Sequence, residues 1–267
     1  MSPMLRTQRY CSLTSLPLAS LLILTSSLAA GQTKIQPGPT PVLVELFTAE
    51  GCSSCPPADA LLAQLASQQP VAGVDIIALG EHVDYWDQSG WRDRFSSPQY
   101  TARQHGYGFR FKINDIYTPE MVVDGAEQFV GNDGAHALSA IAHAGQTTKT
   151  ALVLSKPEVK DHRVTIAVSL AAPAGTLPKA DLYAALIDST DVTNIGGGEN
   201  RGLQLHHAAV VRTLQRIGKL KDLASHPIKA SLTVPHDAVV GNMRVVVFAQ
   251  SSGQGPVVGV TEAPIAQ

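Results

Sequence analysis

Residues 42–80 read VLVELFTAEGCSSCPPADALLAQLASQQPVAGVDIIALG, and this stretch decides the fold of the first half of the chain. It opens on a short apolar run with β-branched members, which is typical of a buried strand. Residues 52–67 carry apolar side chains at helical spacing, with two consecutive prolines in what would be the first turn. Residues 73–80 are a second apolar run. We therefore predict a parallel βαβ unit with Cys52 and Cys55 at the start of its helix.

A mixed helix and strand pattern continues beyond this unit. Residues 121–123 suit a third strand, an Asp-Gly turn signal follows them, and residues 128–130 suit the hairpin partner. A further helix ends at Gly145. We assign residues 42–148 to one α/β domain.

The pattern changes after residue 149, where strand-like runs alternate with turn residues and no strong helix intervenes. These runs are residues 151–154, 163–168, 181–187, 207–212 and 244–249. Several short strands with turn signals predict an antiparallel, sandwich-like arrangement. The predicted fold class is therefore an α/β domain followed by a mostly β domain over residues 150–262.

The N-terminus has the features of an export signal. Residues 1–30 contain two arginines, an apolar stretch that serine and threonine interrupt, and small residues at the cleavage-site spacing. A membrane anchor is the alternative, but the stretch is shorter than the roughly 20 apolar residues that a span needs. Residues 31–41, rich in proline and glycine, suit a flexible leader. We expect a periplasmic or secreted protein that has no membrane contact after cleavage, and a net charge of -2 gives no reason to expect nucleic acid.

Removal of the signal peptide leaves two cysteines, Cys52 and Cys55. In an oxidising compartment such a pair forms a disulfide. The bridge closes so short a loop that it restricts the unfolded chain little, which makes a purely structural purpose a weak explanation. Two alternatives stay open. One is an inert bridge in a binding module, and the other is a metal site for which His82 and His105 would supply further ligands.

The order strand, Cys-x-x-Cys, helix and strand, followed by Thr118-Pro119 before a hairpin and a last helix, resembles the thioredoxin fold. Four stretches are similar to the DUF1223 family of secreted thioredoxin-like proteins: VELFTAEGCSSCPPAD, EHVDYWDQSGWRDRFSSPQYTARQ, YTPEMVVDG and GGGENRGLQLHHAAVVR. They are spread over most of the mature chain. The resemblance implies a thioredoxin-like domain over residues 42–148 and a redox-active cysteine pair, and it names no substrate.

The resemblance to thioredoxins also assigns roles to single residues. Cys52 would be the exposed nucleophile that attacks a partner disulfide, and Cys55 would resolve the mixed disulfide. Pro119 would be cis and would put the Thr118 backbone beside Cys52, where it pairs with an extended peptide. Glu45 would move a proton at the second cysteine; the alternative is a strand carboxylate that is paired or faces outward. The implied partner is a protein thiol or disulfide, and no dissociable cofactor is needed.

His82, Asp84 and Trp86 follow the second strand, where the carboxyl ends of parallel strands border a crevice. They are candidates for a substrate-binding groove. The alternative is a packed insert in which a His–Asp pair holds a loop. His206 and His207 are adjacent, so in a strand their side chains face opposite sides. The leading hypothesis is thiol–disulfide exchange on a protein partner, and its rival is a binding module with an inert bridge.

Overall fold

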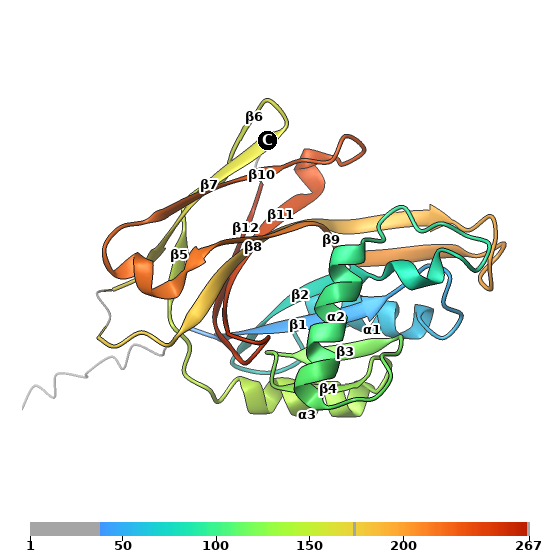
Figure 1. Cartoon of the computed structure of the whole chain (residues 1–267), viewed down its shortest axis with the longest axis horizontal. Coiled ribbons are helices and arrows are strands. Elements are labelled where there is room, and N and C mark those ends of the chain that lie inside the picture. The colour runs from blue at the N-terminus through green and yellow to red at the C-terminus, as the bar shows by residue number, and fades with distance from the viewer. Residues whose placement is uncertain (1–37, 173–174, 266–267) are drawn as a thin grey trace, which may run out of the picture. The chain divides into compact units, whose positions relative to one another are not determined.

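A mixed sheet of eight strands is central to the computed structural model, which describes residues 38–172 and 175–265 (Figure 1). The strands lie in the order β12-β11-β8-β9-β2-β1-β3-β4. Their bounds are β1 Thr40–Thr48, β2 Val74–His82, β3 Glu120–Val123, β4 Glu127–Val130, β8 Ala180–Asn194, β9 Gln204–Lys219, β11 Met243–Ser251 and β12 Val257–Pro264. The predicted signal peptide and residues 31–37 of the predicted leader lie outside the described residues. The last two residues of that leader begin β1.

The predicted βαβ unit is confirmed. β1 and β2 pair in parallel from Thr40 beside Val74 to Thr48 beside His82, and α1 (Pro56–Gln68) connects them. Both strands are buried along most of their length, which explains their continuous apolar sequences. The two strands end side by side, so the loops that follow them share one edge of the sheet.

β3 and β4 form the predicted hairpin on the other side of β1. Asp124 and Gly125 at its turn both have positive φ, 51° and 60°, as the Asp-Gly signal predicts. The Thr118-Pro119 bond just before β3 is cis, and this confirms the prediction.

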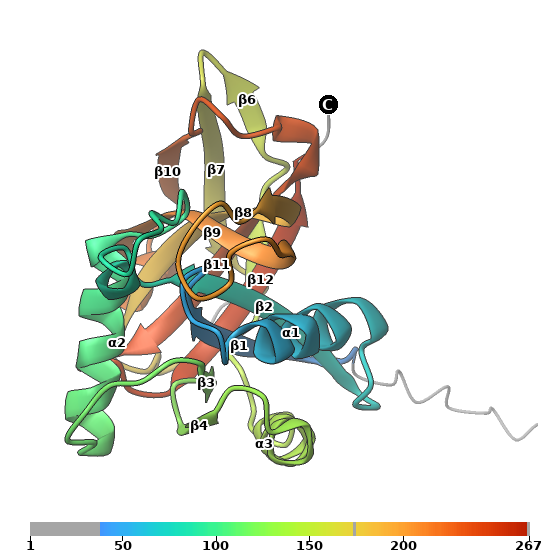
Figure 2. The same ribbon diagram turned by 90° about the vertical axis from the view of Figure 1, so that its right-hand side faces the viewer.

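Helices cover both faces of this part of the sheet (Figure 2). The two further helices are α2 (Pro98–Phe111) and α3 (Gly134–Ala144). α1 and α3 lie on one side of β1 and β3, and α2 lies on the other. Ser97 and Asp133 cap the starts of α2 and α3 by accepting hydrogen bonds from backbone amides. None of the helices in the described part of the chain is long and apolar enough to cross a membrane.

The second half of the chain joins the same sheet. β8 and β9 form a long antiparallel hairpin, and β9 meets β2 in parallel at Gly80 and Val210. β11 and β12 extend the sheet beyond β8. Residues 42–148 and 150–262, which we expected to form two domains, therefore share one sheet. The sequence pattern identifies strands but not their neighbours, because these neighbours are far apart in the chain.

A second sheet packs on this outer part. Its strands lie in the order β10-β7-β5, with β6 paired to β7. Their bounds are β5 Leu152–Leu154, β6 Glu158–Lys160, β7 Arg163–Leu170 and β10 Ile228–Thr233. Ile166 of β7 and Leu232 of β10 share a buried cluster with Leu186 of β8 and Val247 of β11. The second sheet is antiparallel, as the strand pattern predicts, but it packs on the large mixed sheet that also contains the first half of the chain and so does not form a separate sandwich.

Candidate functional site

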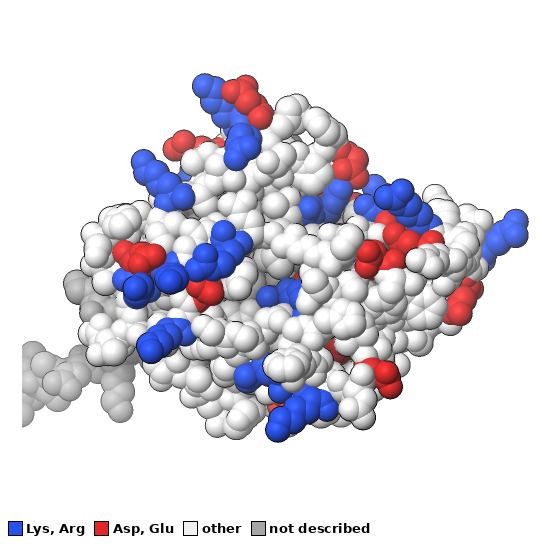
Figure 3. Space-filling view, in the orientation of Figure 1, with Lys and Arg blue, Asp and Glu red and all other residues white. Residues whose placement is uncertain are grey.

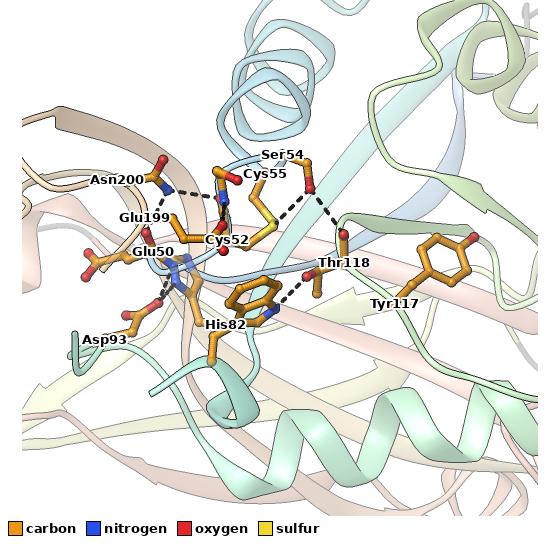
Figure 4. Close-up of a disulfide and its surroundings, with 12 residues drawn as sticks. Glu50, Cys52, Ser54, Cys55, His82, Asp93, Tyr117, Thr118, Glu199 and Asn200 are labelled. Atoms are coloured by element: carbon orange, nitrogen blue, oxygen red, sulfur yellow. Dashed lines mark hydrogen bonds and ion pairs between the residues drawn. A yellow bond between two sulfur atoms is a disulfide. The ribbon is translucent and has the colours of Figure 1, made fainter. Parts of the chain in front are cut away.

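Cys52 and Cys55 form a disulfide in the loop between β1 and α1 (Figure 4). Their Cα atoms are 5.4 Å apart. Cys55 is the N-cap residue of α1, and its carbonyl oxygen accepts hydrogen bonds from the amides of Ala58 (2.8 Å) and Asp59 (3.1 Å). The pair therefore lies at a helix N-terminus, where unsatisfied amides and the helix dipole stabilise a thiolate.

Both cysteines are completely buried, with 0% of their surface exposed. The expectation that Cys52 is exposed is therefore wrong for the disulfide form. Ser53 and Ser54 between them are exposed, so the motif reaches the surface while its sulfur atoms do not. The disulfide packs in a cluster with Phe47, Ala49, Val83, Tyr107 and Val122.

The second half of the chain also contacts the cysteine motif. We call residues 195–203, which join β8 to β9, the β8–β9 loop. Asn200 in this loop is buried, and its Nδ2 donates hydrogen bonds to the carbonyl oxygens of Glu50 (2.8 Å) and Cys52 (3.0 Å). One amide side chain thus fastens the β8–β9 loop to the cysteine motif (Figure 4).

Two further contacts fix the β8–β9 loop. Ser53 N donates a hydrogen bond to Glu199 Oε2 (3.1 Å), and hydrogen bonding from Ser53 holds the pKa of that carboxyl below its usual value. Residues 196–198 are three glycines that lie against Trp91 and Gly90. A Cβ atom on the middle glycine would overlap the Gly90 carbonyl oxygen, so glycine permits this close approach. Sequence reasoning identified a glycine loop, but nothing local shows that it reaches the cysteines.

Thr118 lies on the other side of the motif (Figure 4). Its carbonyl oxygen accepts a hydrogen bond from Ser54 Oγ (3.4 Å), and its Oγ1 accepts one from Trp86 Nε1 (2.8 Å). Ser54 Oγ also lies 3.3 Å from Cys52 Sγ. The structure therefore brings Thr118 and Trp86 together with the cysteines.

His82 and His207 belong to a buried cluster with two carboxylates. His82 Nδ1 is 2.6 Å from Asp93 Oδ2, His207 Nε2 is 3.3 Å from Glu50 Oε1, and the two ring centroids are 5.0 Å apart. Burial lowers the pKa of His82, but the carboxylates of Asp93, Asp59 and Glu50 together outweigh this and raise it above its usual value. His82 thus holds the Asp93 loop, as the alternative interpretation describes. His206 is exposed, so the adjacent histidines face opposite sides, as predicted.

Glu45 and Asp84 lie in other clusters. Glu45 Oε1 is 2.6 Å from the Arg103 guanidinium, and its Oε2 accepts a hydrogen bond from the Tyr107 hydroxyl at 2.5 Å. Glu45 is therefore a paired strand carboxylate. Asp84 Oδ1 accepts a hydrogen bond from Thr101 Oγ1 (2.6 Å), which ties the short helix η1 (Asp84–Trp86) to α2. Among the described residues, no hydrogen bond joins either carboxylate to a cysteine.

Within residues 38–172 and 175–265, no group of three or more His, Cys, Asp or Glu side chains is arranged to hold a metal ion. His105, considered above as a ligand, is exposed on α2. The face drawn in Figure 3 carries positive and negative side chains beside one another, with uncharged surface between them. That face therefore has no large region of uniformly positive or uniformly negative electrostatic potential to attract a charged partner.

Comparison with known proteins identifies relatives of this chain. A search of the curated proteins finds no match. Protein AGR_C_4864 from Agrobacterium tumefaciens, a crystal structure, is similar over 87% of this chain and 97% of its own, with 26% identity and a TM-score of 0.63. HBP35 of Porphyromonas gingivalis is similar over 85% of this chain and 76% of its own, with a TM-score of 0.55; at 13% identity this likeness concerns the fold alone. The family model DUF1223, described as a protein of unknown function, matches residues 43–250, and the chain therefore belongs to the DUF1223 family.

Proposed function

We propose that this protein exchanges thiols and disulfides with a protein partner through Cys52 and Cys55, and that residues 42–148 are thioredoxin-like. The observation that carries the proposal is the disulfide at the N-terminus of α1, in a motif whose Ser54 hydroxyl donates to the Thr118 carbonyl oxygen. A helix N-terminus favours the thiolate that such chemistry needs. The bridge spans a sequence separation of 3, and so short a loop contributes little to stability.

The proposed place of action is the periplasm or the outside of the cell. Residues 1–30 have the composition of a signal peptide. An oxidising compartment also supplies the conditions in which a cysteine pair forms a disulfide and exchanges it with other proteins.

Cys52 is the nucleophile in this proposal. Its thiolate attacks one sulfur of a partner disulfide, and the other partner sulfur leaves as a thiolate. Cys55 then attacks Cys52 Sγ, which releases the partner and closes the bridge. The reverse sequence oxidises a partner dithiol. Ser54 Oγ lies 3.3 Å from Cys52 Sγ, and in this proposal its one proton turns from the Thr118 carbonyl oxygen to the Cys52 thiolate when the bridge opens.

We further propose that the β8–β9 loop, which hydrogen-bonds the Cys52 carbonyl group, moves to give a partner access to Cys52. Exchange needs an approach to sulfur, and both sulfurs are covered in the disulfide form. The two Asn200 hydrogen bonds contribute about 0.5–1.5 kcal/mol each to the closed loop. The free energy of partner binding is large enough to offset the loss of these two hydrogen bonds.

A second candidate is a binding module in which the disulfide is inert and the partner docks elsewhere. The observation in its favour is the complete burial of both cysteines, because reactive cysteines are partly exposed.

The redox equilibrium of the mature protein distinguishes these two functions. The protein is equilibrated in defined glutathione buffers, alkylated and weighed, with Cys52→Ser as the variant that has no bridge. We expect a reversible transition between about -120 and -270 mV, the range of thiol–disulfide catalysts. A bridge that stays closed well below about -300 mV is structural, and that result would reject the exchange function in favour of the binding module.

A further inference from the structure

We propose that Asp59 accepts the proton of Cys55 when that cysteine resolves the mixed disulfide, and returns it when the bridge opens. The inference rests on the exchange function proposed above and supplies a proton acceptor for it. A cysteine attacks as the thiolate and not as the thiol. Because Cys55 is buried, the group that takes its proton must lie inside the protein.

Asp59 lies one helical turn from Cys55 on the same face of α1. Cys55 has helical backbone angles, φ -78° and ψ -37°, and its carbonyl oxygen accepts the Asp59 amide at 3.1 Å. Side chains at positions i and i+4 are neighbours, with Cβ atoms about 5–6 Å apart. The Cα–Cβ bonds of a helix tilt toward its N-terminus, which is the end of α1 at which Cys55 lies. This separation suits proton transfer through one water molecule.

The surroundings of Asp59 suit a group that gains and loses a proton. Asp59 is buried, with 7% of its surface exposed. The groups that act on its carboxyl are Thr48 at the end of β1, through a hydrogen bond, and, through their charges, His82 at the end of β2, His207 of β9 and Asp93. Burial raises the pKa of Asp59 to about 6, although the two histidines lower it in part. A carboxyl with this pKa changes its protonation state close to neutral pH, as an efficient proton acceptor and donor does.

Polar atoms in this cluster are buried without a hydrogen-bond partner among the described residues. They are Glu50 Oε1 and both ring nitrogens of His207. His207 Nε2 and Glu50 Oε1 are 3.3 Å apart, but their directions do not make a hydrogen bond. Unpaired buried polar groups destabilise a fold, so a cluster with a purely structural purpose would pair them. Titratable groups that are buried and incompletely paired are characteristic of functional sites.

The resolving step transfers one proton and two electrons. Cys55 gives its proton to the Asp59 carboxylate, and its sulfur forms a bond to Cys52 Sγ. The bond between Cys52 and the partner breaks, and the partner sulfur leaves as a thiolate that takes a proton from water. The two cysteines are oxidised to the bridge while the partner disulfide is reduced to two thiols, so no further oxidant takes part.

The test uses Asp59→Asn in the whole mature protein. The reduced protein is mixed with excess oxidised glutathione, quenched in acid at intervals, and weighed. The first step adds glutathione to Cys52, and the second, which is intramolecular, expels it. We expect the variant to accumulate the glutathione adduct, because the second step slows on the order of 10²-fold while the first is unchanged.

The matched control is Glu120→Gln. Glu120 is also a buried carboxyl, and burial raises its pKa to about 7, but it hydrogen-bonds Gln104 in a different cluster. We expect this variant to keep the wild-type rates of both steps, which separates the role of Asp59 from the general effect of neutralising a buried acid.

The pH profile separates proton transfer from a structural effect. We expect the second step of the wild type to accelerate as the pH rises through about 6, the pKa of Asp59, and the Asn variant to lack this inflection. A variant with the wild-type rate and profile would overturn the inference and leave the proposed function intact. A wild-type protein that forms no adduct would overturn both. Thermal unfolding shows whether Asp59→Asn folds. If it does not fold, the wild-type protein alone provides the test, because a pH profile of its second step without the inflection near 6 would overturn the inference.

Discussion

Replacing Asn200 with alanine is expected to uncover the disulfide. The Asn200 side chain makes hydrogen bonds of 2.8 and 3.0 Å to the carbonyl oxygens of Glu50 and Cys52, and alanine makes neither. Each bond contributes about 0.5–1.5 kcal/mol net, so the closed loop loses about 1–3 kcal/mol relative to the open one, in which water binds both carbonyl groups. The open population then rises about 5- to 150-fold.

The assay is the rate at which a small dithiol reduces the Cys52–Cys55 bridge, measured by mass after alkylation. When the loop opens and closes quickly, this rate follows the open population. The control is Asn242→Ala, because Asn242 Nδ2 also donates to a backbone carbonyl oxygen, that of Thr190 at 2.6 Å, but at η3 (Val240–Asn242). Its reduction rate should equal that of the wild type. Equal rates for the wild type and Asn200→Ala would refute the proposal that hydrogen bonds from the β8–β9 loop restrict access to the disulfide.

Three further predictions concern neighbouring contacts. Glu199→Gln replaces the carboxylate that accepts from Ser53 N with a weaker amide acceptor on an exposed side chain. The rate at which the dithiol reduces the Cys52–Cys55 bridge should therefore rise less than in Asn200→Ala. A larger rise than in Asn200→Ala would contradict this order of effects. Arg103→Met leaves the Glu45 carboxylate buried without its cation, and the free energy of unfolding in urea should fall by about 3–5 kcal/mol; an unchanged midpoint would count against the pairing. The pKa of His82 is raised above its usual 6.5, so its stabilisation is complete below that pH and is lost as the pH rises through the folded pKa. The pKa of Asp93 is lowered, so its stabilisation is lost as the pH falls through the folded pKa. Asp93→Asn should flatten both limbs of the pH dependence of the free energy of unfolding, and a curve like that of the wild type would argue against the pair.

Local sequence patterns predict the elements around the cysteines well. Helical spacing after the Cys-x-x-Cys motif, two prolines in a first turn and the Asp124-Gly125 turn signal all act within a few residues. The structure has α1 and the β3–β4 hairpin where these signals place them. The two parallel strands are equally local, because a strand buried on both faces needs a continuous apolar run.

Contacts between distant segments are not visible in such patterns. Asn200 is 148 residues from Cys52, and no spacing rule connects an asparagine after three glycines to a disulfide. The sequence around Glu45 is compatible both with proton transfer at a cysteine and with an ion pair. The position of Arg103 on α2 shows that Glu45 forms the ion pair. The apolar run at residues 207–212 predicts a strand that is shorter than β9, which begins at Gln204. The earlier start of β9 brings the β8–β9 loop close to the cysteine motif.

The separation between Cys52 and its cover has a consequence for the order in which the protein is made. The chain emerges N-terminus first at about 5–20 residues per second, so the 148 residues between Cys52 and Asn200 correspond to about 7–30 s. During this interval the carbonyl oxygens of Glu50 and Cys52 lack the Asn200 side chain that binds them in the folded protein. The surroundings of the cysteine motif are therefore completed only after the β8–β9 hairpin has been made.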